Sequence, residues 1–432
     1  MKNIYSIKNV AGRIHYSDAA EGVDVPLPEG MECTGLAAVD EPAAADAKSV
    51  LADSLAAPIN SPPLRELARG RRSAAVIVSD STRAVATARA LPFIVDELLR
   101  GGLSPADVFL IVAVGVHRPA NRKEMREIAG ELAGTLRIVN HDPYGAENLK
   151  LVGITSRGTR VEINRLVAEA DLRLSIGKVE THEFAGYSGG RKSILPGVAS
   201  EKTILYNHRP EMIADPAAVP GRLAGNPIHE DMLEAAKLAG LDFCLNVVQN
   251  ASGSPIAAFA GAPTESHAAA VAYYAGRYGV GTDGRANIHL TTPGAPLNID
   301  LYQSMKPFFG LYPVLKRGDV IVLYSECREG VNSDDMLKPF EYGPNLDGIM
   351  DFLLKNYRIQ MDHALLFCKL LRKGIRVIAH SPGVRPEVFR HMMMTPAESV
   401  EHALVLARDI MAGDGVVPRL RVAPMAQRLI FA

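Results

Sequence analysis

The stretch between Lys178 and His208 carries the densest set of chemically versatile side chains in the sequence. Two histidines, His182 and His208, fall within it together with the basic pair Arg191-Lys192. Its glycine-rich turn consists of Gly186, Tyr187, Ser188, Gly189 and Gly190. Histidine titrates near neutral pH, so it can move protons or bind a metal. Glycines favour unusual backbone angles, and free N–H groups beside a cation suit an anion. We therefore predict an active-site segment here, with an ordinary surface turn as the alternative for the glycines.

Three further polar clusters could do chemistry together with this segment. They are Asp80-Ser81-Thr82-Arg83, Gly115-Val116-His117-Arg118-Pro119 and Tyr302-Gln303-Ser304-Met305-Lys306. The first two follow apolar runs, 73–79 and 107–114, that are typical of short buried strands. Open α/β sheets bind their ligands at the carboxyl ends of strands, so these side chains are candidate site residues. Helix capping is the alternative for Asp80, and a solvated helix face is the alternative for the third cluster.

The elements that must position these residues alternate between strands and helices. Strands are predicted at 73–79, 107–114, 136–140, 149–154, 171–179, 243–248, 287–292, 319–324 and 375–380. This alternation predicts an α/β protein with two α/β domains, mainly parallel sheets and an active-site cleft between the domains. We expect a catalytic and cofactor-binding domain at 1–270 and a smaller α/β domain at 271–415. The tail, 416–432, could return to the first domain.

Bulk composition excludes several classes of protein. The 432 residues carry a formal net charge of -1 without a long basic run, so no extended nucleic-acid surface or polybasic membrane patch is expected. No apolar segment reaches the ~18 residues that a membrane span requires, and a cytoplasmic location is expected. The four cysteines are far apart and form no Cys-x-x-Cys pair, so they are expected to be reduced thiols.

His182, Lys192 and His208 around the run SGGRKSILPG resemble the core motif of the nickel-dependent lactate racemase family. The three polar clusters occur in the order of that family and at similar separations. The resemblance implies a racemase or epimerase of 2-hydroxy acids, which inverts C2 by reversible hydride transfer through a 2-keto acid. The implied cofactor is a nickel-pincer nucleotide, the pyridinium-3,5-bisthiocarboxylic acid mononucleotide with nickel.

The resemblance also implies a role for each candidate residue. His117 and His182 would be the two acid/base groups, with Asp80 orienting His117. His208 would bind nickel, and Lys192 would either be joined covalently to the cofactor or pair with its phosphate. The turn residues Gly186, Ser188, Gly189 and Gly190 would hold that phosphate. The substrate carboxylate would be held by Arg83, Tyr302, Gln303 and Lys306. His363 and His402, in predicted helices, are expected to be structural.

Expected partners are a small 2-hydroxy acid and the cofactor biosynthesis proteins needed for loading, and a homodimer is possible. Arg191 departs from the family pattern, which has a small residue before the lysine, so phosphate or substrate contacts could differ. The alternatives are an NAD-dependent 2-hydroxy acid dehydrogenase and a relative that binds the cofactor without catalysis. Against the dehydrogenase, no Gly-x-Gly-x-x-Gly motif follows a strand with an acidic residue at the usual distance.

Overall fold

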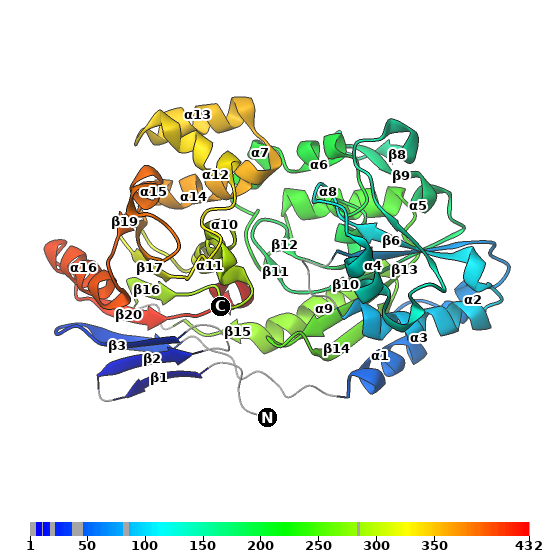
Figure 1. The fold of residues 1–432 in the computed structure, drawn as a ribbon, viewed down its shortest axis with the longest axis horizontal. Helices are drawn as coiled ribbons and strands as arrows, with labels where there is room; N and C mark the ends of the chain where they lie inside the picture. The colour runs from blue at the N-terminus through cyan, green and yellow to red at the C-terminus, as the bar shows by residue number, and fades with distance from the viewer. Residues whose placement is uncertain are drawn as a thin grey trace.

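The computed structural model describes residues 6–10, 12–17, 22–36, 46–80, 86–282 and 286–431. Among them, two six-stranded sheets flanked by helices form the two halves of the molecule, as Figure 1 shows. We call the halves the first and the second domain. The predicted α/β class with mainly parallel sheets is confirmed.

The first sheet has the order β14-β13-β10-β5-β6-β7. Its strands are β5 (Ala74–Ser79), β6 (Val108–Ala113), β7 (Arg137–Asn140), β10 (Leu172–Lys178), β13 (Phe243–Gln249) and β14 (Pro255–Gly261). All neighbours are parallel except β13 and β14. The chain runs from β5 outward to β7 and then returns to β10 on the other side of β5. This reversal makes a switch point between β5 and β10, where sheets of this kind bind ligands.

Helices cover both faces of the first sheet because its strands are apolar on both faces. Val76 and Val78 of β5 pack in one core with α1 (Ala47–Ala56) and α3 (Thr87–Arg100). The alternate residues Ala75 and Ile77 belong to the core on the opposite side, which includes α8 (Pro227–Leu238). A further helix, α9 (Pro263–Tyr278), packs against β13 and β14.

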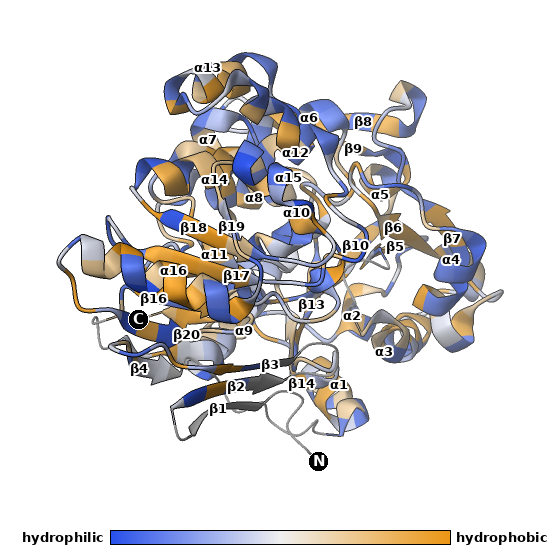
Figure 2. Cartoon of the chain, turned by 60° about the vertical axis from the view of Figure 1, so that its left-hand side comes forward, coloured by the Kyte–Doolittle hydropathy of each residue, from blue (hydrophilic) through white to orange (hydrophobic). Residues whose placement is uncertain are grey.

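The second sheet has the order β19-β18-β17-β16-β20-β4, and all its strand pairs are parallel. Its strands are β4 (Glu32–Leu36), β16 (Ile288–Thr291), β17 (Val320–Tyr324), β18 (Arg376–His380), β19 (Thr395–Pro396) and β20 (Arg419–Val422). One face packs against α16 (Val400–Gly413) and the other against α11 (Lys306–Leu311) and α14 (Asp362–Arg372). Figure 2 shows β16, β17 and β18 in hydrophobic colours, whereas α4 (Arg122–Ala129) is mainly hydrophilic.

Three features differ from the predicted division at residue 270. Helix α9 runs without a break from 263 to 278, so it crosses that boundary and continues on the first sheet. Strand β4, which the prediction groups with the first domain, pairs with β20 and completes the second sheet. Strand β20, at the start of the predicted tail, lies inside the second sheet because β16 and β4 pair with its two edges. The end of the tail does contact the first domain, where Tyr274 of α9 donates to Arg428 O at 2.7 Å and Ile430 packs against the Tyr187 cluster.

Smaller elements surround the two sheets. Strands β1 (Ser6–Val10), β2 (Arg13–Ser17) and β3 (Gly22–Pro26) form an antiparallel sheet below β20 in Figure 1. Two successive helices, α13 (Leu346–Asn356) and α14, lie between β17 and β18. Among the described residues, no helix combines the length and the apolar character that crossing a membrane requires.

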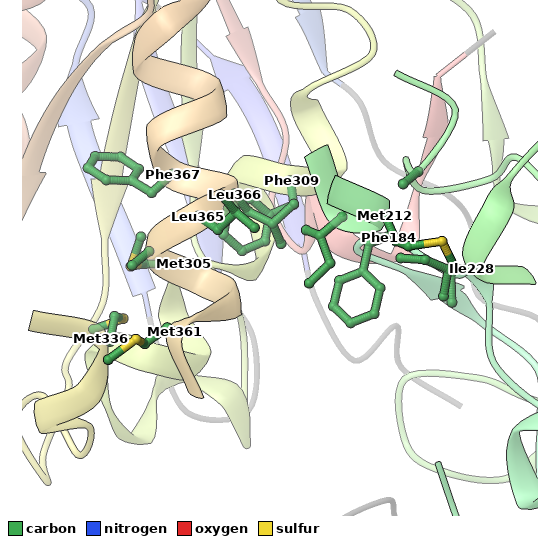
Figure 3. Packing of buried hydrophobic residues seen from close by; sticks show 14 of the residues in the cluster. Phe184, Met212, Ile228, Met305, Phe309, Met336, Met361, Leu365, Leu366 and Phe367 are labelled. Carbon is green, nitrogen blue, oxygen red and sulfur yellow. The ribbon is translucent and has the colours of Figure 1, made fainter. Parts of the chain in front are cut away.

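A single apolar cluster connects the two domains. Figure 3 shows Phe184, Met212 and Ile228 of the first domain beside Phe309 and Leu366 of the second. Helix α7 (Pro210–Ala214) packs on α14 in the same region. Packing within this cluster holds the two sheets in their relative orientation.

Candidate active site

Three of the predicted site segments leave the first sheet at one edge. Strands β10, β5 and β6 are parallel neighbours, so their carboxyl ends lie side by side. Asp80 follows β5, His117 follows β6 and the segment 178–208 follows β10. The fourth segment, 301–306, follows β16 at the switch point of the second sheet.

The expected hydrogen bond between Asp80 and His117 is present. Asp80 Oδ2 lies 2.8 Å from His117 Nδ1, and the Asp80 side chain is 6% exposed. An ionised carboxylate only accepts hydrogen bonds, so Nδ1 carries the proton and Nε2 is left to exchange a proton with a ligand. The backbone turn is held by Gly115 N, which donates to Gly197 O at 3.0 Å. His117 is therefore tied to the segment that leads to His208.

His182 lies on a short hairpin formed by β11 (Thr181–His182) and β12 (Gly186–Tyr187). Its Nδ1 lies 3.1 Å from Glu183 Oε2 and accepts a hydrogen bond from the backbone N–H of Ala185 at 3.4 Å. The contact with Glu183 is an ion pair when the His182 ring is protonated. Both active-site histidines of the first domain thus have a carboxylate beside Nδ1.

His208 is the C-cap of α6 (Glu201–Asn207) and is 6% exposed. Its Nδ1 is buried and has no hydrogen-bond partner among the described residues. Burial, assisted by the charge of Lys192, lowers the pKa of His208 to about 3. The ring is therefore neutral at pH 7, which is the form that binds a metal. The rings of His182 and His208 both pack edge-on against Phe184, at 4.7 and 5.1 Å between centroids.

The glycine turn uses several of its own N–H groups inside the protein. Gly190 N donates to Asn246 Oδ1 at 2.9 Å, and Ser188 N donates to Glu180 O at 2.9 Å. Ser188 Oγ donates to Lys178 O at 2.7 Å. These groups shape the turn, so a phosphate there would depend on other groups such as Lys192, which lies in the 3-10 helix Gly190–Ser193.

The Arg191 side chain is buried and contacts the backbone of the glycine turn. Its guanidinium is buried and Nη2 donates to the carbonyls of Ala185 and Tyr187, both at 2.9 Å. Nη1 lies 2.8 Å from His267 Nε2. Burial lowers the pKa of Arg191 to about 9, so the group is still charged at pH 7. Arg191 therefore holds the glycine turn in place through these hydrogen bonds.

The second domain contributes Lys306 to the same site. Lys306 Nζ lies 3.4 Å from Glu183 Oε1, so Glu183 connects Lys306 with His182. Tyr302, on α10 (Leu301–Ser304), donates from its hydroxyl to Asp362 Oδ1 at 3.0 Å. The backbone N–H of Gln303 donates to Asp300 Oδ1 at 2.7 Å, which caps α10.

Sequence reasoning missed two residues of this network, Glu183 and His363. His363 stacks on the ring of Tyr302 at 3.9 Å, and its Nε2 lies 4.0 Å from Glu183 Oε1. Burial alone would raise the pKa of Glu183, but the charges of His182, Lys306 and His363 outweigh it and hold the pKa well below its usual value. The only signal in the sequence is that Glu183 adjoins His182, because its other contacts come from residues more than 100 positions away.

Arg83, with Ser81 and Thr82, lies outside the described residues. Among the residues that the structure does describe, no group of three or more histidine, cysteine or acidic side chains could hold a metal ion by itself. His208 would thus be a single protein ligand.

Comparison with known proteins identifies the family of this chain. Residues 19–221 match the lactate racemase N-terminal domain, and residues 282–421 match the lactate racemase C-terminal domain. Lactate racemases from Thermoanaerobacterium thermosaccharolyticum and Lactiplantibacillus plantarum are 34% and 32% identical over 376 residues, which is 86% of this chain and 88% of each relative.

Solved structures agree with the sequence matches. The lactate racemase apoprotein from Thermoanaerobacterium thermosaccharolyticum superposes with a TM-score of 0.89 at 31% identity, covering 97% of this chain and 100% of the other. A protein from Thermotoga maritima shares the fold, with a TM-score of 0.64 at 16% identity over 90% of this chain and 100% of the other. The chain belongs to the lactate racemase family.

Proposed function

We propose that this protein racemises a small 2-hydroxy acid such as lactate, using a nickel-pincer nucleotide as cofactor. The observation that carries the proposal is the pair of histidines with a carboxylate beside Nδ1, His117 with Asp80 and His182 with Glu183. Racemisation needs an acid/base group for each orientation of the substrate hydroxyl, and histidine has a suitable pKa for both directions. Membership of the lactate racemase family supports the reaction class.

The chemistry at C2 explains why a cofactor is needed. The hydrogen on C2 is a very weak acid beside a carboxylate, so its removal as a proton by a side chain is unfavourable. Removal as hydride leaves a planar 2-keto acid, and return to either face gives both enantiomers. When bound, the nickel-pincer nucleotide supplies the hydride acceptor that no side chain provides.

The residues present fit such a cofactor. His208 offers a neutral, buried imidazole whose Nδ1 has no hydrogen-bond partner, as expected for the ligand of a soft-donor nickel complex. Lys192 is near enough for its charge to lower the pKa of His208, so it would lie beside the same group. These two residues would hold the cofactor against the hairpin that carries His182.

The remaining residues bind the substrate and move its hydroxyl proton. A histidine with Nδ1–H bound to a carboxylate accepts the proton on Nε2, and the carboxylate stabilises the imidazolium that forms. Lys306 would bind the substrate carboxylate, which would compete with Glu183 for its ammonium group. Tyr302, held by Asp362 and His363, would line the same wall.

The test is a stereochemical screen of the full chain produced with cofactor biosynthesis proteins. Single enantiomers of 2-hydroxy acids, lactate first, are incubated with nickel-loaded protein, and loss of optical purity is followed by chiral chromatography. Substrate deuterated at C2 should keep its label in the inverted product, whereas proton removal would exchange it with water. Full nickel occupancy without inversion of any 2-hydroxy acid would contradict the proposal and favour a cofactor-binding protein without catalysis.

A further inference from the structure

A cavity of about 160 Å³ lies on the far side of Arg191, between α8 and α9. We call it the Arg191 cavity. Its polar lining consists of Arg191, His229, Lys237, Thr264 and His267. No lining residue comes from the second domain, and none is a residue to which the racemase proposal gives a role. The cavity is therefore separate from the site described above.

The lining of the Arg191 cavity contains positively charged side chains and no negatively charged ones. Among the described residues, no carboxylate forms an ion pair with Arg191. Arg191 is 2% exposed, and its Nε has no hydrogen-bond partner; His229 Nδ1 is also buried without one. A buried cation without a counter-charge is costly, so the cavity favours an anion.

The start of α9 adds to this preference. This helix has 16 residues, and its N-cap, Ala262, has no side chain that could accept a hydrogen bond from the first turn. The first-turn residues Pro263 and Thr264 line the cavity. Pro263 has no N–H group, so Thr264 offers the backbone N–H of this turn at the cavity, and the partial positive charge of the helix N-terminus, offset in part by Glu265, favours an anion there.

The rest of the lining limits what the anion can be. Leu233, Ala236 and Leu241 supply an apolar part of the lining. A cavity of this volume admits a small molecule. We propose that the Arg191 cavity binds a small carboxylate with a short apolar chain.

Such a ligand would act on the turn that Arg191 holds. Arg191, which lines the cavity, donates from its guanidinium to the carbonyls of Ala185 and Tyr187, on either side of Gly186. An anion in the cavity would offset the buried positive charge and favour the orientation in which the guanidinium holds the turn. The cavity is thereby connected to the hairpin of His182 without sharing its residues.

Propionate is a suitable probe, and calorimetric titration of the full chain measures its binding at constant ionic strength. The Lys306→Gln variant serves as the background, because it removes one of the two cations, Arg83 and Lys306, that would bind a carboxylate in the racemase site. One saturable propionate site per chain is expected, with ring resonances of His229 and His267 shifting during the titration. Propionamide, which has the same shape without the charge, should not bind.

A matched pair of variants at the mouth of the cavity locates the site. Ala268 is exposed on α9 and lines the cavity, so both Ala268→Glu and Ala268→Gln should fold. The glutamate should weaken propionate binding at least about tenfold by like-charge repulsion, and the glutamine should leave it nearly unchanged. Absence of saturable propionate binding, equal effects of the two variants, or binding of inorganic phosphate in place of propionate would overturn the proposal. Racemase activity enters none of these readouts.

Discussion

Glu183 Oε1 lies 3.4 Å from Lys306 Nζ, and this ion pair joins the hairpin of the first domain to the start of α11 in the second. Both side chains are mostly buried, with 12% and 19% exposed. Each charge is compensated by a partner that another part of the chain supplies. Loss of one partner should therefore affect both stability and activity.

Lys306→Gln should lower the free energy of unfolding by roughly 1–3 kcal/mol, because it leaves the buried Glu183 carboxylate without its cation. Adding Glu183→Gln should recover part of that loss, which urea denaturation of the two single variants and the double variant would measure. Lys355→Gln, at an exposed position of α13, is the control and should change little. Additive single effects, within about 0.5 kcal/mol, would show that the two residues are not coupled.

His117→Gln and His182→Gln should each lower turnover by roughly 10²-fold or more while nickel stays bound, since each removes an acid/base group. Both directions should be impaired, because the equilibrium constant between enantiomers is one. The pH dependence of the wild-type protein should be bell-shaped and report two macroscopic pKa values. Near-normal racemisation by fully loaded His182→Gln would mean that a single base suffices.

His208→Ala should lose nickel while the protein stays folded, because the side chain donates a ligand and no hydrogen bond from Nδ1. Metal analysis and circular dichroism would measure the two properties. His391→Ala, at an exposed position on α15 (Pro386–His391), should retain nickel. Equal nickel content in both variants would exclude His208 as the ligand.

Gly186→Ala should destabilise the protein and abolish cofactor retention. Gly186 has a φ of 77°, and an added Cβ would collide with the backbone oxygen of Arg222. Gly413→Ala is the matched control, since a Cβ there meets no atom within 4 Å and alanine favours the helix by roughly 0.5–1 kcal/mol. Thermal unfolding of the two variants should shift in opposite directions. An unchanged melting temperature for Gly186→Ala would mean that the turn can relax.

Stability should fall as the pH drops below about 6.5. Burial lowers the pKa of His141 to about 4, so below pH 6.5 the unfolded chain binds a proton that the folded protein does not. The contribution of His141, at most roughly 3 kcal/mol, is complete above the unfolded pKa and is lost as the pH approaches 4. His141→Gln should therefore reduce the slope of unfolding free energy against pH between 6.5 and 4, and His391→Gln should not. Parallel curves for wild type and His141→Gln would contradict this.

Local signals in the sequence predicted much of the fold and part of the site. Apolar runs followed by polar clusters located β5, β6 and β10, whereas the pairing of Asp80 with His117 was implied by the resemblance to the family. The role of Glu183 could not be predicted, because its partners Lys306 and His363 reach it only through packing of the two domains. The departure of Arg191 from the family pattern was visible in the sequence, but its contact with the backbone carbonyls of the turn was not, because burial directs the guanidinium there.

The edge strand β4 comes early in the chain but belongs to the sheet of the second domain. The C-terminal family match, 282–421, does not include β4, although β4 pairs with β20 in that domain's sheet. A fragment limited to 282–421 would expose the outer edge of β20, and unpaired edges promote association between chains. During translation β4 is made among the first strands, whereas its partner β20 is made near the end of the chain. Strand β4 is thus synthesised early but is among the last strands to pair within a sheet.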